Sequence, residues 1–345
     1  MALVANSRHP AFETMRAEGV EVITAAEQSV SALPEMTVGL LNLMPDAALR
    51  ATDRQFIRMV SAYAGSADIR VFPFTLAAEH RGEAARRHVE DHYVEFESLQ
   101  VSGLDALIVT GANPTHHHLA REVFWSGLID VFDWARINVH GVLCSCLATH
   151  VVMGHYQGIE RTRLPSKRWG VYSHRLLFDD HPLSRGVSSP VDAPHSHWYD
   201  LTRDQMESAG ARVLLESDQA GVHMAVSHDD FYIFFQGHPE YEEISLLKEY
   251  KREVGRFHRG ESTEYPPLPE HYFKQGAAAR LGEYREKLVL AKNAGVEPPD
   301  LPESSVFPTG VGTWTEPGKI IYRNWLAGIQ RRKESGREPG RLTTN

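Results

Sequence analysis

The two cysteines of this 345-residue chain lie two positions apart, in the stretch GVLCSCLATH at residues 141–150. Cys144 falls inside an apolar run, and a strand there would bury its side chain and leave the thiol inert. Cys146 falls where the run ends, at an expected sharp turn into a helix, whose first amides can stabilise a thiolate or an oxyanion. Free cysteines are most often small buried core residues. The position of Cys146 nevertheless suggests a nucleophile, with Cys144 as packing.

A cysteine nucleophile needs a base and a group that orients the base. The stretch FFQGHPEY offers both, because an aromatic strand-like run ends there in a corner that carries His238 and, two residues later, Glu240. A strand end can present the imidazole at the same edge of a sheet as Cys146, and Glu240 can fix its tautomer and stabilise the imidazolium. Most of the nineteen histidines should be structural or exposed. The Gly-His-Pro corner favours His238 among them.

The elements that must position these residues alternate regularly in the first half of the chain. Apolar, β-branched runs alternate with stretches of helical periodicity, which predicts parallel β-α-β units with right-handed crossovers. In such open sheets, ligands bind beyond the carboxyl ends of the strands. The middle third has short, turn-separated strands, and the end of the chain is helical and Pro-rich. The expected strands of the first half are 37–45, 68–74, 104–114 with its terminal loop, and 138–145, and the helices are 53–65 and 121–137.

The composition limits the kinds of partner and compartment. A formal net charge of −9, from 45 acidic residues against 36 Lys and Arg, argues against a nucleic-acid partner. We find no apolar run of the roughly 18 residues that a bilayer span needs, and no signal peptide. Cysteines two positions apart are a poor disulfide pair. We therefore expect a soluble cytoplasmic protein with reduced thiols and no membrane partner.

A set of motifs matches one family in order and spacing from about residue 36 to residue 327. Together they resemble the MetA-type homoserine O-acyltransferases of methionine biosynthesis, which are homoserine O-succinyltransferases or O-acetyltransferases. The resemblance covers most of the chain and is far more specific than any single motif. The motifs are LLNLMP, LIVTGANP, the turn at Cys146, KRWGVYSH, PHSHW, GHPEY followed by YKREV, PEHYF, and the terminal TW and YRNWL.

The resemblance implies a class I glutamine amidotransferase-like fold, which is a flavodoxin-like α/β fold with a mostly parallel sheet flanked by helices, here with a C-terminal helical extension. It implies a triad of Cys146, His238 and Glu240. In the implied ping-pong reaction the cysteine takes an acyl group from acyl-CoA as a thioester and passes it to the hydroxyl of L-homoserine. Acyl-CoA, either succinyl-CoA or acetyl-CoA, is then a co-substrate, and no bound cofactor is expected.

The resemblance also assigns substrate-binding positions. Lys167 in SKRWGVY and Arg252 in EYKREV match substrate-binding residues, and Ser196 in PHSHW matches a position tied to substrate choice. Homoserine carries a carboxylate, for which Arg offers a planar fork and Lys a point charge. Without the resemblance, both would be interpreted as solvated surface charges. Thr115 stands where the family separates acetyl from succinyl donors. It lacks the negative charge of the glutamate found in some members, which would repel a succinyl carboxylate, so succinyl-CoA is favoured.

Other departures from the family concern the neighbourhood of the nucleophile. Asp46 and Ala47 follow NLMP, where the family usually has lysine, so any role of that lysine is lost or moved. Leu147 replaces a tryptophan directly after the nucleophile. Together with THHHLARE and CLATH, these departures indicate a divergent branch, and a branch can change its acceptor.

Several alternatives stay open on the sequence alone. A serine O-acyltransferase would differ by one methylene in its acceptor, which a pocket discriminates by only about 1–3 kcal/mol. A glutamine amidotransferase would hydrolyse glutamine on the same triad, although it typically has glycine where this chain has Ala148. A non-catalytic binding protein would follow if Cys146 were buried. The histidines at 116–118, and His195 with His197, lack the acidic or cysteine partners of a zinc site, so no metal is expected.

We divide the chain into an N-terminal extension at 1–35, an acyltransferase domain at 36–265, a C-terminal extension packing on it at 266–333, and a flexible tail at 334–345. The expected partners are L-homoserine and acyl-CoA. A homodimer and a need for an accessory protein both remain open.

Overall fold

The computed structural model describes residues 2–5, 7–28, 35–64, 67–76, 78–274, 276–307 and 312–336. Within these residues an eleven-stranded sheet has the order β2-β1-β4-β3-β5-β6-β11-β10-β9-β7-β8. Its strands are β1 (Leu3–Ala5), β2 (Val22–Thr24), β3 (Glu35–Leu41), β4 (Asp68–Phe74), β5 (Ala106–Val109), β6 (Val142–Ser145), β7 (Thr162–Leu176), β8 (Val191–Asp200), β9 (Arg212–Ser217), β10 (Gly221–Val226) and β11 (Tyr232–Phe235).

The sheet is parallel from β2 to β11 and antiparallel from β11 to β8. The central strands β5 and β6 have the sequences ALIV and VLCS, and every residue of both is buried. Continuous apolar strands of this kind belong to a parallel sheet that is covered on both faces. The expected α/β fold with a mostly parallel sheet is confirmed.

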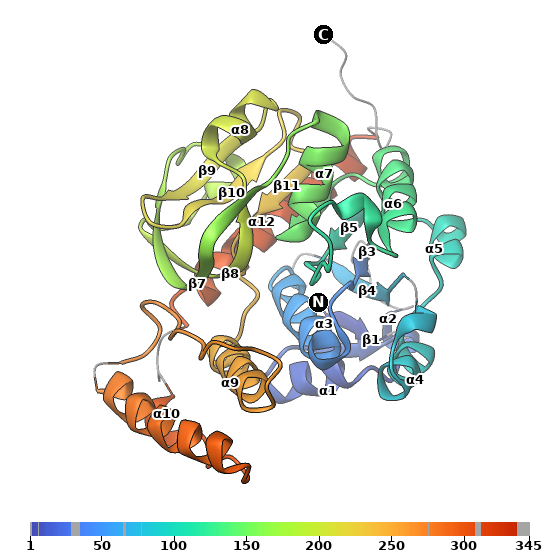
Figure 1. Ribbon diagram of the computed structural model, residues 1–345. Coiled ribbons are helices and arrows are strands. Elements are labelled where there is room, and N and C mark those ends of the chain that lie inside the picture. Colours follow the sequence, from blue (N-terminus) through green and yellow to red (C-terminus); the bar gives the residue numbers. More distant parts are fainter. Residues whose placement is uncertain are drawn as a thin grey trace.

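Helices cover both faces of the sheet (Figure 1). One face packs against α1, α3 and α12, and the other packs against α5, α6, α7 and α8. A third apolar cluster joins α9, α10 and α11. No helix among the described residues is both long and apolar enough to cross a membrane. The helices are α1 (Pro10–Ala17), α2 (Ala25–Gln28), α3 (Asp46–Ser61), α4 (Glu83–His92), α5 (Phe96–Ser102), α6 (Trp125–Asn138), α7 (Leu147–Gln157), α8 (Arg203–Ser208), α9 (Ser245–His258), α10 (Ala277–Ala294), α11 (Glu303–Val306) and α12 (Thr315–Glu334).

Both ends of the described chain take part in the fold. β1 pairs with β2 and with β4, so the sheet begins before the boundary expected at residue 36. These two strands have three residues each, which is too short for a periodic signal. The buried side chains of Leu3 and Phe12 pack this end of the sheet against the core. At the other end α12 contributes Trp325 to the same core, while α10 projects from the body beside α9 (Figure 1). Of the expected tail, residues 337–345 lie outside the described residues.

Candidate active site

Cys146 lies at the turn between β6 and α7. Its φ of 49° and ψ of −103° are rare for a residue with a side chain, and they let the helix begin directly after the turn. The Cys146 amide donates to the carbonyl oxygen of Phe235 at 2.7 Å, which ties the turn to β11. Cys146 is partly exposed, whereas Cys144 is fully buried and burial raises the pKa of its thiol well above the ordinary value. Of the two thiols, Cys146 is therefore the one that a substrate can reach.

His238 emerges at the same edge of the sheet. β11 pairs in parallel with β6, and Phe235 lies opposite Ser145, so the residues that follow these two strands come out side by side. The chain then turns at Gly237, where a Cβ would lie 2.7 Å from ring nitrogens of two buried histidines and 2.8 Å from a backbone carbonyl oxygen. Only glycine fits this corner, which places the imidazole of His238 beside Cys146.

The three side chains form a connected and largely buried group. Nδ1 of His238 lies 2.8 Å from Oε1 of Glu240, and the imidazole is also hydrogen-bonded to Cys146. Burial lowers the pKa of His238, but the charge of Glu240 and the hydrogen bonds with Cys146 and Glu240 outweigh it and raise the pKa to about 10. Tyr241 stacks on the imidazole with ring centroids 4.4 Å apart. An imidazolium beside a sulfur favours the thiolate, which is the nucleophilic form, so this arrangement can perform covalent acyl transfer.

Lys167 and Ser196 meet at Glu249, which opens the motif EYKREV but has no feature in the sequence that marks it as a site residue. Nζ of Lys167 lies 3.1 Å from Oε2 of Glu249, and the Ser196 hydroxyl donates to the same oxygen at 2.6 Å. The Tyr241 hydroxyl donates to Oε1 at 2.7 Å. Burial opposes ionisation of Glu249, but Lys167 and these hydroxyls lower the pKa of its carboxyl. This largely buried anion therefore joins β7, β8 and α9 behind the tyrosine that stacks on His238.

Arg252 lies one turn further along α9, at the outer margin of this group. Its Nε donates to the carboxylate of Glu253 at 3.1 Å, and its side chain is 40% exposed. The charge of Arg252 still helps to lower the pKa of Glu249. The structure thus brings Lys167 and Ser196 into direct contact with a common partner and leaves the guanidinium of Arg252 facing solvent.

Thr115 lies in the loop that follows β5, where Glu122 and Arg161 hold the backbone. The amides of Thr115 and His116 donate to Oε1 of Glu122 at 2.7 and 2.6 Å. Nη2 of Arg161 donates to the carbonyl oxygens of His116 and the next residue at 3.2 and 2.9 Å. Arg161 could not be selected from the sequence, because one arginine in a turn has no distinguishing pattern.

A cation lies against the NLMP loop even though the family lysine is absent. Arg81, which is distant in sequence, donates to the carbonyl oxygen of Met44 at 3.0 Å and pairs with Asp46 at 3.1 Å. The loop is close to Cys146, because a Cβ on Gly111 would lie 3.5 Å from Cβ of Cys146 and 3.8 Å from Sδ of Met44. Asp46 therefore binds Arg81, whose side chain lies at this margin of the site.

One group among the described residues has the spacing of a metal site. Nε2 of His9 and Nε2 of His88 lie 3.0 and 2.9 Å from Oδ2 of the buried Asp53. However, Nδ1 of His9 accepts a hydrogen bond from the amide of Ala11 at 3.1 Å, so in the neutral ring Nε2 carries the proton and donates it to Asp53. A protonated nitrogen has no lone pair for a metal. We therefore interpret the group as a hydrogen-bonded cluster.

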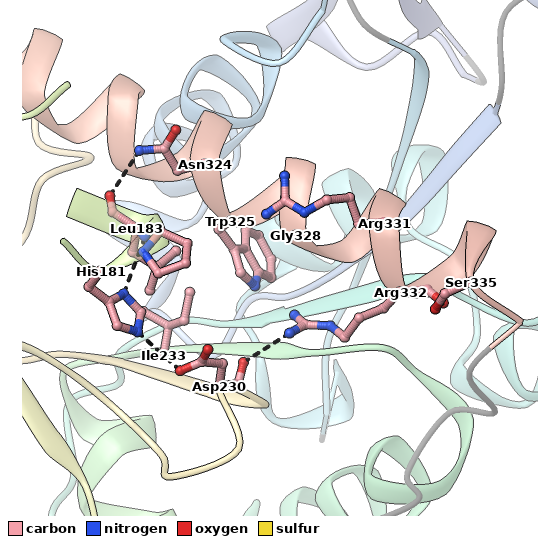
Figure 2. A pocket seen from close by; sticks show the side chains of 11 residues that line it. His181, Leu183, Asp230, Ile233, Asn324, Trp325, Gly328, Arg331, Arg332 and Ser335 are labelled. Atoms are coloured by element: carbon pink, nitrogen blue, oxygen red, sulfur yellow. Dashed lines mark hydrogen bonds and ion pairs between the residues drawn. The ribbon is translucent and has the colours of Figure 1, made fainter. Parts of the chain in front are cut away.

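A pocket of about 290 Å³ lies elsewhere, against α12 (Figure 2). Several of its polar groups contact each other or nearby backbone: Nε2 of His181 lies 3.2 Å from the carboxylate of Asp230, and Asn324 donates to the carbonyl oxygen of Leu183 at 2.9 Å. None of the residues expected from the sequence to form the triad or to bind substrate lines it. The pocket is therefore separate from the site around Cys146.

Comparisons with known proteins agree over almost the whole chain. The family model of homoserine O-succinyltransferase matches residues 2–333. A homoserine O-succinyltransferase of Methylococcus capsulatus is 47% identical over 330 residues, which cover 95% of this chain and 93% of that protein. One of Nitrosococcus oceani is 48% identical over 339 residues, which cover 98% and 95%. Among solved structures, a glutamine amidotransferase from Methylobacillus flagellatus has a TM-score of 0.47 and 14% identity, covering 86% of this chain and 96% of that chain.

The family expected from the motifs is confirmed by the family model and by these relatives, each of which is aligned over more than nine-tenths of its own length. The chain belongs to the homoserine O-succinyltransferase family.

Proposed function

We propose that this chain transfers a succinyl group from succinyl-CoA to the hydroxyl of L-homoserine through a thioester on Cys146. The observation that carries the proposal is the turn that exposes Cys146 beside His238, whose positive charge is stabilised by Glu240. The names of the relatives support homoserine as acceptor and succinyl as the transferred group. The geometry supports the roles of the individual residues.

In the first half-reaction, Sγ of Cys146 attacks the carbonyl carbon of the thioester and forms a new carbon–sulfur bond. The oxyanion that develops is held by amides in the first turn of α7, which have no partner within the helix. The intermediate collapses as the bond to the CoA sulfur breaks. His238 gives its proton to that sulfur, so CoA leaves as the thiol and the imidazole becomes neutral.

In the second half-reaction, neutral His238 takes the proton of the homoserine hydroxyl as its oxygen attacks the thioester carbonyl. The bond to Sγ of Cys146 then breaks, and the thiolate and imidazolium of the resting enzyme are restored. Lys167 and Arg252 supply positive charge for the homoserine carboxylate. Glu249 keeps Lys167 fixed beside the triad through contacts with Ser196 and Tyr241.

Intact-protein mass spectrometry tests the proposal without an acceptor. The purified chain is mixed with succinyl-CoA or acetyl-CoA, and we expect a mass gain of one succinyl group that maps to Cys146 and disappears when homoserine is added. Cys146→Ala should abolish the gain, whereas Cys144→Ala should retain it, since that side chain is buried in the core. Equal loss in both variants, or a gain that homoserine does not remove, would rule out the assigned mechanism.

A further inference from the structure

We infer that Arg161 binds the free carboxylate of the succinyl group and so selects the acyl donor. The inference rests on the proposed succinyl transfer through Cys146. It concerns a residue in the turn before β7, outside the triad and outside the motifs that carry the family resemblance.

The guanidinium of Arg161 is fixed in place by three contacts. Its Cζ lies 3.7 Å from the centroid of the Tyr199 ring, and Nη2 donates to the carbonyl oxygens of His116 and His117 at 3.2 and 2.9 Å. The Tyr199 hydroxyl is itself 3.0 Å from Nδ1 of His117. These contacts hold the plane of the guanidinium against the loop that carries Thr115, so little rotamer freedom is left to lose on binding.

This fixed cation has no carboxylate within ion-pair distance in the described part of the chain. Its Nε is buried and makes no hydrogen bond there. The nearby carboxylate of Glu122 accepts from the amides of Thr115 and His116 instead. Burial lowers the pKa of Arg161. A half-buried cation with an unused donor is costly to leave unpaired, and an anionic ligand would relieve that cost.

The succinyl group supplies such an anion. Its carboxylate lies two methylenes beyond the acyl carbon. The loop that Arg161 holds at His116 and His117 also contains Gly111, where a Cβ would lie 3.5 Å from Cβ of Cys146. A planar guanidinium matches a carboxylate better than it matches a neutral methyl group. An acetyl group ends in a neutral methyl group, which cannot pair with Arg161. The phosphates of CoA are the other anions of the substrate, but every CoA ester shares them, so they cannot produce a preference between donors.

The experiment compares donors that differ only in the acyl end. Thioester formation on Cys146 is followed by mass spectrometry without homoserine, using succinyl-CoA, acetyl-CoA and butyryl-CoA, which has the chain length of succinyl without its charge. We expect Arg161→Gln to slow acylation by succinyl-CoA at least about tenfold and to leave acylation by butyryl-CoA within about twofold. Arg161→Lys should restore part of the loss, because it keeps the charge but not the fork.

Tyr199→Phe is the matched control, because it removes the hydrogen bond to the loop and keeps the ring under the guanidinium. It should preserve the ratio of succinyl to butyryl transfer. The inference is overturned if Arg161→Gln slows all three donors equally, if it leaves the ratio unchanged, or if Tyr199→Phe reproduces its effect. A wild-type chain that accepts no donor would instead refute the proposed function itself. Acylation by butyryl-CoA also shows that each variant has kept its fold.

Discussion

Oε1 of Glu240 lies 2.8 Å from Nδ1 of His238, and both side chains are almost completely withdrawn from solvent. Glu240→Gln keeps an acceptor at this place but removes the charge, so burial should then lower the pKa of His238 from about 10. We expect thioester formation at neutral pH to slow by about 10²- to 10⁴-fold. Single-turnover acylation measured from pH 6 to pH 10 checks this, and the alkaline limb should move to lower pH in the variant.

The same pair predicts a pH dependence of folding stability. Because the pKa of His238 is raised from 6.5 to about 10 on folding, its contribution to stability is fully present below pH 6.5 and is lost as the pH rises toward 10. Glu240→Gln should move that loss to lower pH. The free energy of unfolding, measured with urea across this pH range, should therefore depend on pH differently in the two chains. Parallel pH dependences would contradict the positive charge assigned to His238. Glu79→Gln, at a side chain that is 72% exposed, serves as control.

Glu242 anchors the corner that carries His238 to α3. It accepts hydrogen bonds of 2.7 Å from Nε and from Nη2 of Arg54 and one of 2.8 Å from Arg58. Burial raises the pKa of Glu242, but these bonds outweigh it and lower the pKa to about 2. A folded pKa below the unfolded value of 4.5 means that the stabilisation is present above pH 4.5 and is lost as the pH falls toward 2.

Glu242→Gln should accordingly cost about 1.5–3 kcal/mol of unfolding free energy at pH 7, and the difference from the native chain should shrink as the pH falls below 4.5. Chemical unfolding at several pH values measures it. Glu83→Gln breaks the pair with Arg87, in which both side chains are 71% exposed, and should cost no more than about 0.5 kcal/mol. A penalty for Glu242→Gln that stays constant down to pH 3 would indicate lost packing rather than lost charge pairing.

The sequence was sufficient for the parts of the site that follow strand ends. Cys146 and His238 each come directly after a short apolar run, so their place at the edge of the sheet could be predicted without coordinates. Glu249 and Arg161 could not, because a charged residue on a polar helix or in a turn has the same local pattern as a solvated one. Their partial burial depends on contacts with residues of β7 and β8: Glu249 contacts Lys167 and Ser196, and Arg161 lies over the ring of Tyr199. The strands β1 and β2, at one end of the sheet, could not be predicted because three residues show no periodicity.

Thr115 permits a test of donor choice that is independent of Arg161. Thr115→Glu would place a carboxylate beside the already buried Glu122, and it should slow transfer from succinyl-CoA more than transfer from acetyl-CoA, because like charges repel. Thr115→Gln introduces a side chain of nearly the same size as glutamate but without its charge. It should leave the ratio of the acylation rates with the two donors close to that of the native chain. Acylation rates with both donors provide the measurement. Equal shifts in the two variants would mean that size, and not charge, determines the choice.

Glu249 contacts both Lys167, which we propose binds the acceptor, and the tyrosine that stacks on His238. The two half-reactions can show which of these contacts matters more. Its Oε2 holds Lys167 and Ser196, while its Oε1 accepts from Tyr241, whose ring stacks on His238. Glu249→Gln should release Lys167, because a neutral amide cannot pair with the ammonium, and we expect KM for homoserine to rise by about tenfold or more. Thioester formation without acceptor should change much less.

A double-mutant cycle with Lys167→Met sharpens the test of Glu249. If Glu249 acts by fixing Lys167, the two substitutions should be strongly non-additive in their effect on KM for homoserine, since either one already breaks the contact. If Glu249 acts mainly through Tyr241, Glu249→Gln should slow acylation as much as transfer, and the two substitutions should be additive. The measured coupling therefore distinguishes a residue that prepares the acceptor site from one that positions the base.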